Sequence, residues 1–355
     1  MKLKESFFCL TVSFSISQAI TIQSYEWAMR INWLDNLKAL GIFLVIFGHM
    51  LPNSHLRQYI YSFHIPLFFF VSGYLFDRSK YNFGQFFRKK FSTLMIPYLF
   101  FATLSFLFWF FIVRNLSISG WALAIDPLKP LIGILYGIGS GDWRVPMNAP
   151  LWFLPCLFIV ETVFYFVNNR YYLIIFAVLG YLVTFLPFRL PWSSDVAFAA
   201  IVFYGMGHFY KDTWMSHKAL PLLFTFHFAF CFLNSPVDMN DLLYGNIFYF
   251  YISAYLGVLF YSTLCKIIKK NRVITYVGSN TIIIIGLVGI ARFILNGLSY
   301  TLFGIKHIEQ LGLGFTLAAT IVQISLIIPV IYCINKWFPF ILGRHVGQTF
   351  EDKNK

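Results

Sequence analysis

The chain has 355 residues, of which 59% are hydrophobic and only 12% are charged. Soluble domains carry roughly 25% charged residues, so this composition excludes an ordinary soluble protein and indicates a protein whose solvent is lipid. The formal net charge of +13 does not indicate a nucleic-acid partner, because Lys and Arg accumulate in the cytoplasmic loops of any multi-span membrane protein.

The first 28 residues differ in character from the rest of the chain. Lys2 and Lys4 precede a Ser/Thr-rich stretch at 7–22 that resembles a weak signal segment and is too polar for a good span. Alternatively, translation starts at Met29, directly before the first convincing helix. We therefore divide the chain into an N-terminal extension (1–28), a membrane domain (29–345) and a polar tail (346–355).

Beyond residue 29, apolar runs of spanning length follow one another. A helix needs about 20 mostly apolar residues to cross a bilayer. A shorter piece at 130–138 lies among prolines and glycines and suits a re-entrant or surface segment better than a span. The sequence predicts an all-α, polytopic bundle of about ten transmembrane helices, near 36–52, 58–76, 93–113, 150–168, 171–188, 196–210, 219–234, 244–268, 276–296 and 313–338.

The positions of Lys and Arg predict the orientation of these spans. With ten spans, twenty of the 27 basic residues fall on the side of the N-terminus and six on the other side, while Arg292 lies within a span. Positive charge favours the cytoplasm, so the N-terminus is expected there. A reporter fused near Lys270 is then expected in the cytoplasm, and one near Asp238 outside.

Ionisable side chains within spans are costly and therefore mark candidate functional positions. Lys38 and His49 lie eleven residues apart in the first span, on one helical face and separated by about 16 Å along the axis. Asp35 lies in the same segment. His64, on the second span, is expected at a depth similar to that of His49, because the short connection makes the first two helices neighbours. Two imidazoles facing one cavity could exchange protons with a hydroxyl near neutral pH.

Other intramembrane groups have a plainer interpretation. A transmembrane His is commonly a helix-to-helix hydrogen-bonding partner, which is our expectation for His208 and His227. Glu161, on the fourth span, is a candidate for fixing a histidine tautomer or contacting a sugar. The five cysteines are scattered without zinc-binding spacing, so no metal site is expected.

A basic cluster, Arg88-Lys89-Lys90, follows two phenylalanines on a predicted cytoplasmic loop. Such a cluster could hold the phosphates and base of a nucleotide-like donor. The positive-inside rule and binding of lipid headgroups account for it equally well. The long loop 114–149 could present aromatic and carboxylate groups to a glycan or form an interfacial aromatic belt, with Trp121, Asp126, Asp142, Trp143 and Trp152.

Two blocks of residues resemble the opening of the membrane acyltransferase 3 family, in its fucose 4-O-acetylase-like branch. They are the run from Trp33 to Ile42 continued to Gly48-His49, and the run from Phe63-His64 to Leu75. Later segments that fit in order are Phe87-Arg88-Lys89-Lys90 to Pro97-Tyr98, Leu151-Trp152-Phe153-Leu154 with Glu161, and Val277-Gly278-Ser279-Asn280-Thr281. The resemblance covers nearly all of the chain after residue 29.

The resemblance implies an enzyme of a bacterial cytoplasmic (inner) membrane that transfers an acyl group, usually acetyl, from cytoplasmic acyl-CoA to a sugar hydroxyl. The sugar would belong to a surface polysaccharide or its lipid-linked precursor. The family's basic residue and essential histidine map onto Lys38 and His49, and its donor-contacting run onto Arg88, Lys89 and Lys90.

One position departs from the resembled pattern. Many members carry a histidine where this chain has Val288, and Arg292, one turn further on, is a possible substitute. Two alternative functions remain open at this stage: a transporter or flippase, because buried His, Glu and Arg also suit a substrate path, and a non-catalytic component of a glycan-assembly complex.

Overall fold

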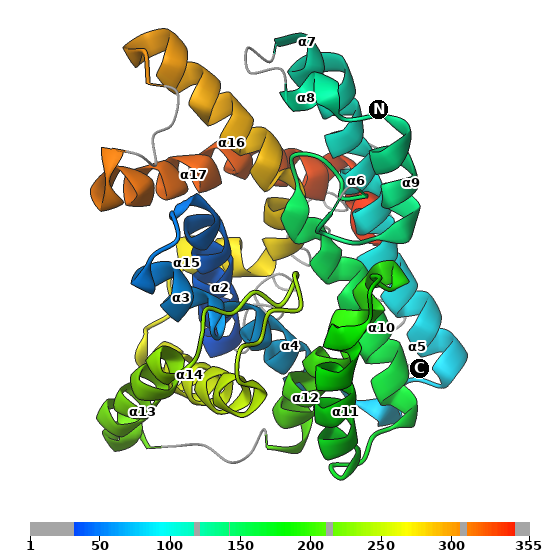
Figure 1. Cartoon of the computed structure of the whole chain (residues 1–355), viewed down its shortest axis with the longest axis vertical. Helices are drawn as coiled ribbons and strands as arrows, with labels where there is room; N and C mark the ends of the chain where they lie inside the picture. Colours follow the sequence, from blue (N-terminus) through cyan, green and yellow to red (C-terminus); the bar gives the residue numbers. More distant parts are fainter. Residues whose placement is uncertain (1–31, 117–120, 142, 211–215, 306–310, 345–355) are drawn as a thin grey trace, which may run out of the picture.

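A computed structural model describes residues 32–116, 121–141, 143–210, 216–305 and 311–344. Within these ranges the regular elements are helices, and the one β feature is an isolated bridge between Asp238 and Leu243. The helices form one bundle with an extended hydrophobic core (Figure 1). The predicted all-α class is confirmed, whereas the extension 1–28 and the tail 346–355 lie outside the described residues.

The first half of the chain runs from α2 to α10. The π-helix η2 continues α5 directly into α6. In chain order the elements are α2 (Asn32–Met50), α3 (His55–Tyr61), α4 (His64–Tyr74), η1 (Arg78–Lys80), α5 (Phe83–Lys90), η2 (Phe91–Met95), α6 (Ile96–Phe108), the π-helix η3 (Trp109–Val113), α7 (Arg114–Leu116), α8 (Trp121–Ala124), α9 (Leu128–Tyr136), η4 (Ala149–Trp152) and α10 (Phe153–Phe166).

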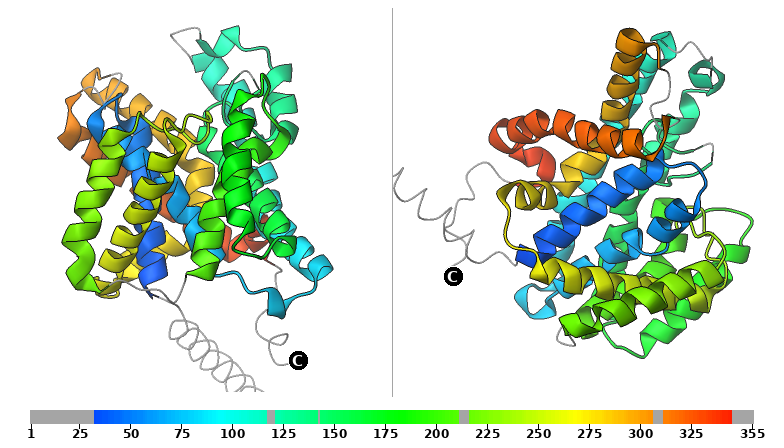
Figure 2. Two further views of the ribbon diagram at one scale, coloured as in Figure 1. Left: turned by 60° about the horizontal axis from the view of Figure 1, so that its bottom comes forward. Right: turned by 90° about the vertical axis from the view of Figure 1, so that its left-hand side faces the viewer.

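The second half adds the packed pairs α11 with α12 and α13 with α14, followed by the C-terminal helices. Helices α13 and α14 pack against each other and run side by side at one edge of the bundle (Figures 1 and 2). The elements are α11 (Tyr172–Leu182), η5 (Val183–Phe185), η6 (Pro191–Ser193), α12 (Ser194–Phe209), η7 (His217–Ala219), α13 (Leu220–Leu233), α14 (Ile247–Ile267), α15 (Arg272–Ser279), α16 (Thr281–Phe303), α17 (Leu313–Trp337) and η9 (Pro339–Leu342).

Six of the described helical stretches are long and apolar enough to cross a membrane: Asn32–Met50, Phe83–Leu116, Ala149–Phe166, Ile247–Ile267, Thr281–Phe303 and Leu313–Trp337. Two further apolar stretches, Tyr172–Phe185 and His217–Leu233, are shorter. The remaining two predicted spans correspond to α4, of 11 residues, and α12, of 16 residues. The chain is thus a multi-helix membrane protein, while the count of ten spans and the orientation stay predictions.

The short helices α4 and α12 lie against each other in the interior. A Cβ added to Gly73 would lie 1.8 Å from the Tyr204 carbonyl oxygen, and one added to Gly207 would lie 2.0 Å from that of Phe70. Only glycine permits backbones to approach so closely, as in other membrane helix pairs. Protein, and not lipid, surrounds these helices, so they need not be long enough to span by themselves.

Two predicted spans are broken in the structure. The run 58–76 divides into α3 and α4 at Ser62 and Phe63, and the run 276–296 divides into α15 and α16 at Asn280. Asn280 has non-helical dihedral angles (φ −119°, ψ 24°) and its side chain donates to the Tyr276 carbonyl. Each break falls on a few polar residues inside a longer apolar run, and the apolar character of the whole run hid it.

The segment at 130–138 forms the short helix α9, which packs on α6. The Tyr98 hydroxyl donates a hydrogen bond of 2.7 Å to the Ile134 carbonyl. Gly137 ends the helix with φ +70°, a left-handed conformation that glycine adopts without strain. This short, packed helix agrees with the expectation that the segment is not a full span.

Candidate functional site

A hollow of about 290 Å³, here called the basic cavity, opens between the first turns of α2 and α16, the π-helix η2 and α10. Three cationic side chains, Lys38, Lys90 and Arg344, line it together with the carboxylate of Glu161. Lys38 and Lys90 come from the two segments that the sequence singled out, 52 positions apart in the chain. The fold therefore brings the predicted basic positions of α2 and α5 into one hollow.

Lys38 is held at this cavity by its own helix. Its Nζ lies 2.9 Å from Oδ1 of Asp35, one turn earlier, and the Asp35 side chain is only 6% exposed. Helix α15 closes over this turn, because a Cβ added to Gly278 would lie 2.0 Å from the Asp35 carbonyl oxygen. The structure thus assigns Asp35 a place beside Lys38, at the opposite end of α2 from His49.

The basic run of α5 is divided by the geometry of the helix. Lys90 Nζ lies 2.7 Å from Oε1 of Glu161 on α10, whose side chain is 2% exposed. Lys89 instead donates to the Tyr81 hydroxyl at 2.8 Å, and Arg88 is exposed; neither lines the basic cavity. The one cation of the predicted run that lines the cavity is Lys90.

Glu161 lies in the basic cavity, and its bonding partner is a lysine. Its second oxygen, Oε2, is buried without a hydrogen-bond partner among the described residues. A buried carboxylate oxygen that retains an unused acceptor position is costly unless a ligand or water satisfies it. The position of Glu161 favours contact with a molecule in this cavity over the fixing of a histidine tautomer.

Arg344 is a cavity residue that sequence reasoning missed. Its Nη1 donates to Asn335 Oδ1 at 3.1 Å, and Asn335 Nδ2 in turn donates to Asn280 Oδ1 at 2.8 Å. Gly343, with φ +67°, lies against the Ser92 backbone and turns the chain toward the cavity. No local motif marks Arg344, because it lies beyond the last long helix and reaches the site only through tertiary packing.

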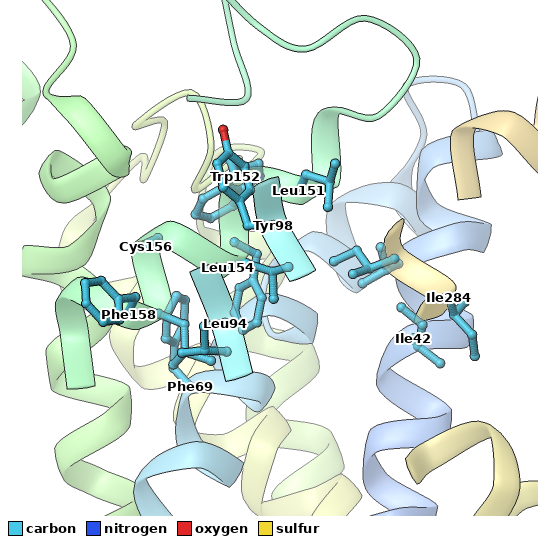
Figure 3. Close-up of a cluster of buried hydrophobic side chains, with 14 of the residues drawn as sticks. Ile42, Phe69, Leu94, Tyr98, Leu151, Trp152, Leu154, Cys156, Phe158 and Ile284 are labelled. Atoms are coloured by element: carbon cyan, nitrogen blue, oxygen red, sulfur yellow. The ribbon is translucent and has the colours of Figure 1, made fainter. Parts of the chain in front are cut away.

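An apolar passage continues the basic cavity along α2. A smaller hollow of about 30 Å³ shares Phe68, Phe153 and Leu154 with the cavity and is also lined by Ile42 and Val45 of α2. In the surrounding core, Ile42 and Ile284 lie beside each other and belong to the same cluster as Phe69, Leu94 and Leu154 (Figure 3). Residues 38, 42, 45 and 49 follow helical spacing on one face of α2, and the lining of this hollow extends along that face as far as Val45, one turn before His49.

His49 lies in the last turn of α2, and its side chain is exposed. Its Nδ1 is 3.2 Å from the Tyr61 hydroxyl of α3, and its backbone carbonyl accepts a 2.9 Å hydrogen bond from Arg292 of α16. Nε2 has no hydrogen-bond partner among the described residues. When Nδ1 carries the proton and donates to Tyr61, Nε2 presents a lone pair that can act as a base or nucleophile.

His64 is close to His49 but differs from it in exposure. It is 2% exposed, and its Nδ1 donates to the Ile60 carbonyl at 2.8 Å, which places the proton on Nδ1. The Tyr61 ring contacts both imidazoles, with centroids 5.9 Å from His49 and 4.8 Å from His64. The expected similar depth of the two residues is therefore met, with Tyr61 in contact with both.

A second hollow, of about 340 Å³, lies beyond the other end of α2; we call it the Arg57 pocket. Its charged residues are Arg57, Asp238 and Asp241, and Tyr61 links it to His49. None of these four was a sequence candidate, because the loop 234–246 carries no motif and meets α3 only through folding. The lining residues are Asn53, Ser54, Arg57, Gln58, Tyr61, Pro236, Val237, Asp238, Asp241 and Leu243.

The remaining sequence candidates are placed as follows. His227 donates from Nδ1 to the Ser253 carbonyl at 2.9 Å and links α13 to α14, as expected of a structural histidine. Val288 is buried, and its carbonyl accepts a hydrogen bond from Gln323, while Arg292 reaches the His49 backbone. Trp152 is buried, so it is not part of a glycan-facing surface. The side chains of Trp121 and Asp142 lie outside the described residues.

Within the ranges that the structure describes, no group of three or more His, Cys, Asp or Glu side chains could hold a metal ion. A family model described as an acyltransferase domain, Acyl_transf_3, matches residues 31–334, which is most of the chain. No curated protein and no solved structure matches the chain significantly. The match includes α2, the Arg57 pocket and the basic cavity's Lys38, Lys90 and Glu161, and it ends before Arg344. The chain belongs to the acyltransferase 3 family of membrane proteins.

Proposed function

We propose that this protein transfers an acyl group, acetyl in the first instance, from acyl-CoA on the cytoplasmic side to a sugar hydroxyl of a surface polysaccharide or its lipid-linked precursor. The proposed setting is a bacterial inner membrane. The observation that carries the proposal is the arrangement along α2. Lys38 lies in a basic cavity at one end, the accessible imidazole of His49 lies three turns further on, and an apolar passage leads from one toward the other.

The basic cavity suits the donor. Three cations face one carboxylate there, so phosphate groups are attracted to Lys38, Lys90 and Arg344. The pantetheine arm of CoA is long and carries amide N–H groups, one of which can donate to the free Oε2 of Glu161. The thioester at its end then enters the apolar passage toward His49.

His49 supplies the chemistry in either of two ways. As a general base, Nε2 takes the proton of the acceptor hydroxyl while that oxygen attacks the thioester carbonyl; the C–S bond breaks and the thiolate of CoA leaves. As a nucleophile, Nε2 attacks the thioester carbonyl and displaces the thiolate of CoA, and the acceptor hydroxyl then attacks the acyl-imidazole; the N–acyl bond breaks and the freed Nε2 takes the hydroxyl proton. In both, the Nδ1 contact with Tyr61 holds the ring, and His64 supports Tyr61 from the other side.

The direct test uses membranes that contain the full chain, radiolabelled acetyl-CoA and their endogenous glycan. Replacement of His49 by Ala is expected to lower label transfer by about 10²- to 10⁴-fold, the usual contribution of a catalytic acid–base group. The matched control is His55→Ala, since His55 is also exposed and lies on the neighbouring helix α3. Label transfer that survives His49→Ala would refute the catalytic role of His49.

A second measurement addresses the acceptor and the transporter alternative. O-acetyl signals in surface polysaccharide are compared by NMR between cells with and without the gene. The proposal expects one O-acetyl signal to disappear, with the polysaccharide still exported. Loss of the polysaccharide itself from the surface, without loss of any acyl group, would favour a transporter or flippase.

A further inference from the structure

The Arg57 pocket has no role in the proposed binding of the donor, but hydrogen bonds fix the position of its walls. One wall is α3 and the other is the loop between α13 and α14. Asn234 fastens the two ends of this loop, since its Nδ2 donates to the Tyr244 carbonyl and its Oδ1 accepts from the Asn246 backbone. Gln58 of α3 donates to the carbonyls of Cys231 and Asn234 and ties the loop to the helix. The walls are therefore held in position by hydrogen bonds.

The tip of the loop aims carboxylates into the pocket. Asp238 and Leu243 exchange backbone hydrogen bonds of 2.8 and 2.9 Å, which close a tight turn. Asp238 Oδ1 also accepts from the Asn240 backbone, and Asp241 lines the same hollow. Burial and the neighbouring Asp241 carboxylate raise the pKa of Asp238 to about 6, so at neutral pH the Asp238 side chain is mostly an ionised hydrogen-bond acceptor.

The charge of the pocket selects the class of ligand. One cation, Arg57, faces two carboxylates, so the pocket is negative on balance and disfavours phosphates and other anions. Hydroxyl groups can donate to the carboxylates and accept from Arg57, while Pro236, Val237 and Leu243 offer apolar surface to C–H groups. A neutral carbohydrate combines these features.

The pocket reaches the reacting imidazole through Tyr61. This side chain lines the pocket, is 6% exposed, and contacts Nδ1 of His49 through its hydroxyl. The Arg57 guanidinium lies over the Tyr61 ring, 4.7 Å from its centroid. The Tyr61 side chain thus separates the pocket from His49, at the end of α2 opposite the basic cavity.

We propose that the Arg57 pocket binds the acceptor, and that it takes a neutral sugar whose hydroxyls are held by Asp238, Asp241 and Arg57. This inference rests on the proposed acyl transfer and deepens it by naming the acceptor site and its chemical class. The same residues then discriminate against acidic sugars, because a uronate carboxylate would meet two like charges.

The test separates acceptor from donor by kinetics, so the natural acceptor need not be known. Membranes that contain the full chain and endogenous glycan receive radiolabelled acetyl-CoA at varied concentration. Asp238→Asn and Asp241→Asn are expected to lower the rate at saturating acetyl-CoA by roughly 10- to 100-fold, the effect of losing a hydrogen bond to a charged group. The KM for acetyl-CoA is expected to stay within about twofold of wild type.

The control variant is Asp77→Asn, which neutralises a partly exposed carboxylate that lines neither hollow and is expected to leave the rate unchanged. Thermal unfolding of each purified variant, with and without CoA, verifies the fold and donor binding. As a second arm, methyl glucoside, methyl galactoside and methyl fucoside are expected to inhibit transfer to glycan at least about 10-fold more strongly than methyl glucuronoside.

Wild-type rates in both Asp variants, or equal inhibition by neutral and acidic glycosides, would overturn the acceptor assignment while leaving the proposed function intact. A raised KM for acetyl-CoA in those variants would also overturn it, since the pocket would then serve the donor. If wild-type membranes transfer no label and CoA does not alter the unfolding temperature, the proposed function itself fails, and the acceptor assignment with it.

Discussion

The basic cavity and the Arg57 pocket lie at opposite ends of α2 and differ in charge. The cavity has Lys38, Lys90 and Arg344 against Glu161, whereas the pocket has Arg57 against Asp238 and Asp241. A phosphate-rich donor is attracted to the first and repelled by the second, and a neutral polyol has no such preference for the first. In the proposed reaction, this difference in charge would direct the donor and the acceptor to opposite ends of α2.

The difference between the two hollows can be tested by replacing one cation at a time in the basic run of α5. Lys90→Gln removes a charge from the cavity and retains a hydrogen-bond donor for Glu161, so we expect the KM for acetyl-CoA to rise by roughly 10-fold, the cost of about 1.4 kcal/mol of binding. Steady-state label transfer at varied acetyl-CoA provides the measurement.

Lys89→Gln is the matched control, because the two lysines are adjacent but Lys89 contacts Tyr81 outside the cavity. Its KM is expected to change by less than about twofold, as for a solvent-screened charge. Equal effects of the two substitutions would mean that net charge at the membrane surface, and not the cavity, attracts the donor.

Tyr61→Phe tests the contact that links the Arg57 pocket to His49. The variant keeps the ring between His49 and His64 but removes the hydroxyl that contacts His49 Nδ1. Loss of one neutral hydrogen bond is worth about 1 kcal/mol, so we expect kcat to fall by roughly 5-fold. The pH profile of kcat should shift as well, because the tautomer of His49 is no longer held.

An unchanged pH profile in Tyr61→Phe with a lowered kcat would contradict a positioning role through His49 and indicate a packing defect. Tyr61→Leu lacks both the hydroxyl and the ring, so its kcat is expected to be no higher than that of Tyr61→Phe. The comparison of Phe and Leu therefore separates the hydroxyl's contribution from that of the aromatic contact.

Asp238 allows the smallest and most specific test. Its pKa in the folded protein, about 6, lies above the ordinary value of 3.8 because of burial and the Asp241 carboxylate, while Arg57 acts in the opposite direction. Tyr61 and His49 are further titratable groups at this end of α2. A raised carboxyl pKa means that the ionised form is unfavourable in the folded protein. That cost is absent below pH 3.8 and fully present above about pH 6.

We therefore expect Asp238→Asn to raise the unfolding temperature at pH 7 by a few degrees and to lose this advantage as the pH falls below about 4. Acyl transfer by the wild type should decline as the pH drops through about 6, because protonation removes an acceptor from the pocket, and the variant should lack this step. A variant that is less stable than wild type at pH 7 would contradict the assigned cause of the pKa shift.

Hydropathy predicted much of the fold. The features that it failed to predict each have a physical reason. Every predicted span contains a helix in the structure, because apolar runs of this length have few alternatives in lipid. The divisions at Ser62 and Asn280 escaped prediction because backbone dihedrals and side-chain hydrogen bonds, and not polarity, end those helices. The extent to which short helices such as α4 and α12 are enclosed by protein also depends on tertiary packing.

The candidate site was predictable where it is local in sequence. Lys38 and His49 share a face of one helix, and spacing alone relates them. The pairing of Lys90 with Glu161 and the arrival of Arg344 depend on contacts between distant segments, which a single sequence does not encode visibly. The sequence alone does not distinguish Arg88, Lys89 and Lys90, because the packing of α5 determines that Lys90 is the one that lines the cavity.

In the proposed reaction, donor and acceptor reach His49 from opposite sides of the membrane, which can be examined with sealed vesicles of known orientation. Acetyl-CoA does not cross membranes, so radiolabelled acetyl-CoA is added to sealed inside-out and right-side-out vesicles that contain the full chain and its glycan. We predict label on lumenal glycan in inside-out vesicles and none in intact right-side-out vesicles, with activity recovered when the latter are opened. Equal labelling in both orientations, or label confined to glycan on the side of acetyl-CoA, would contradict the account.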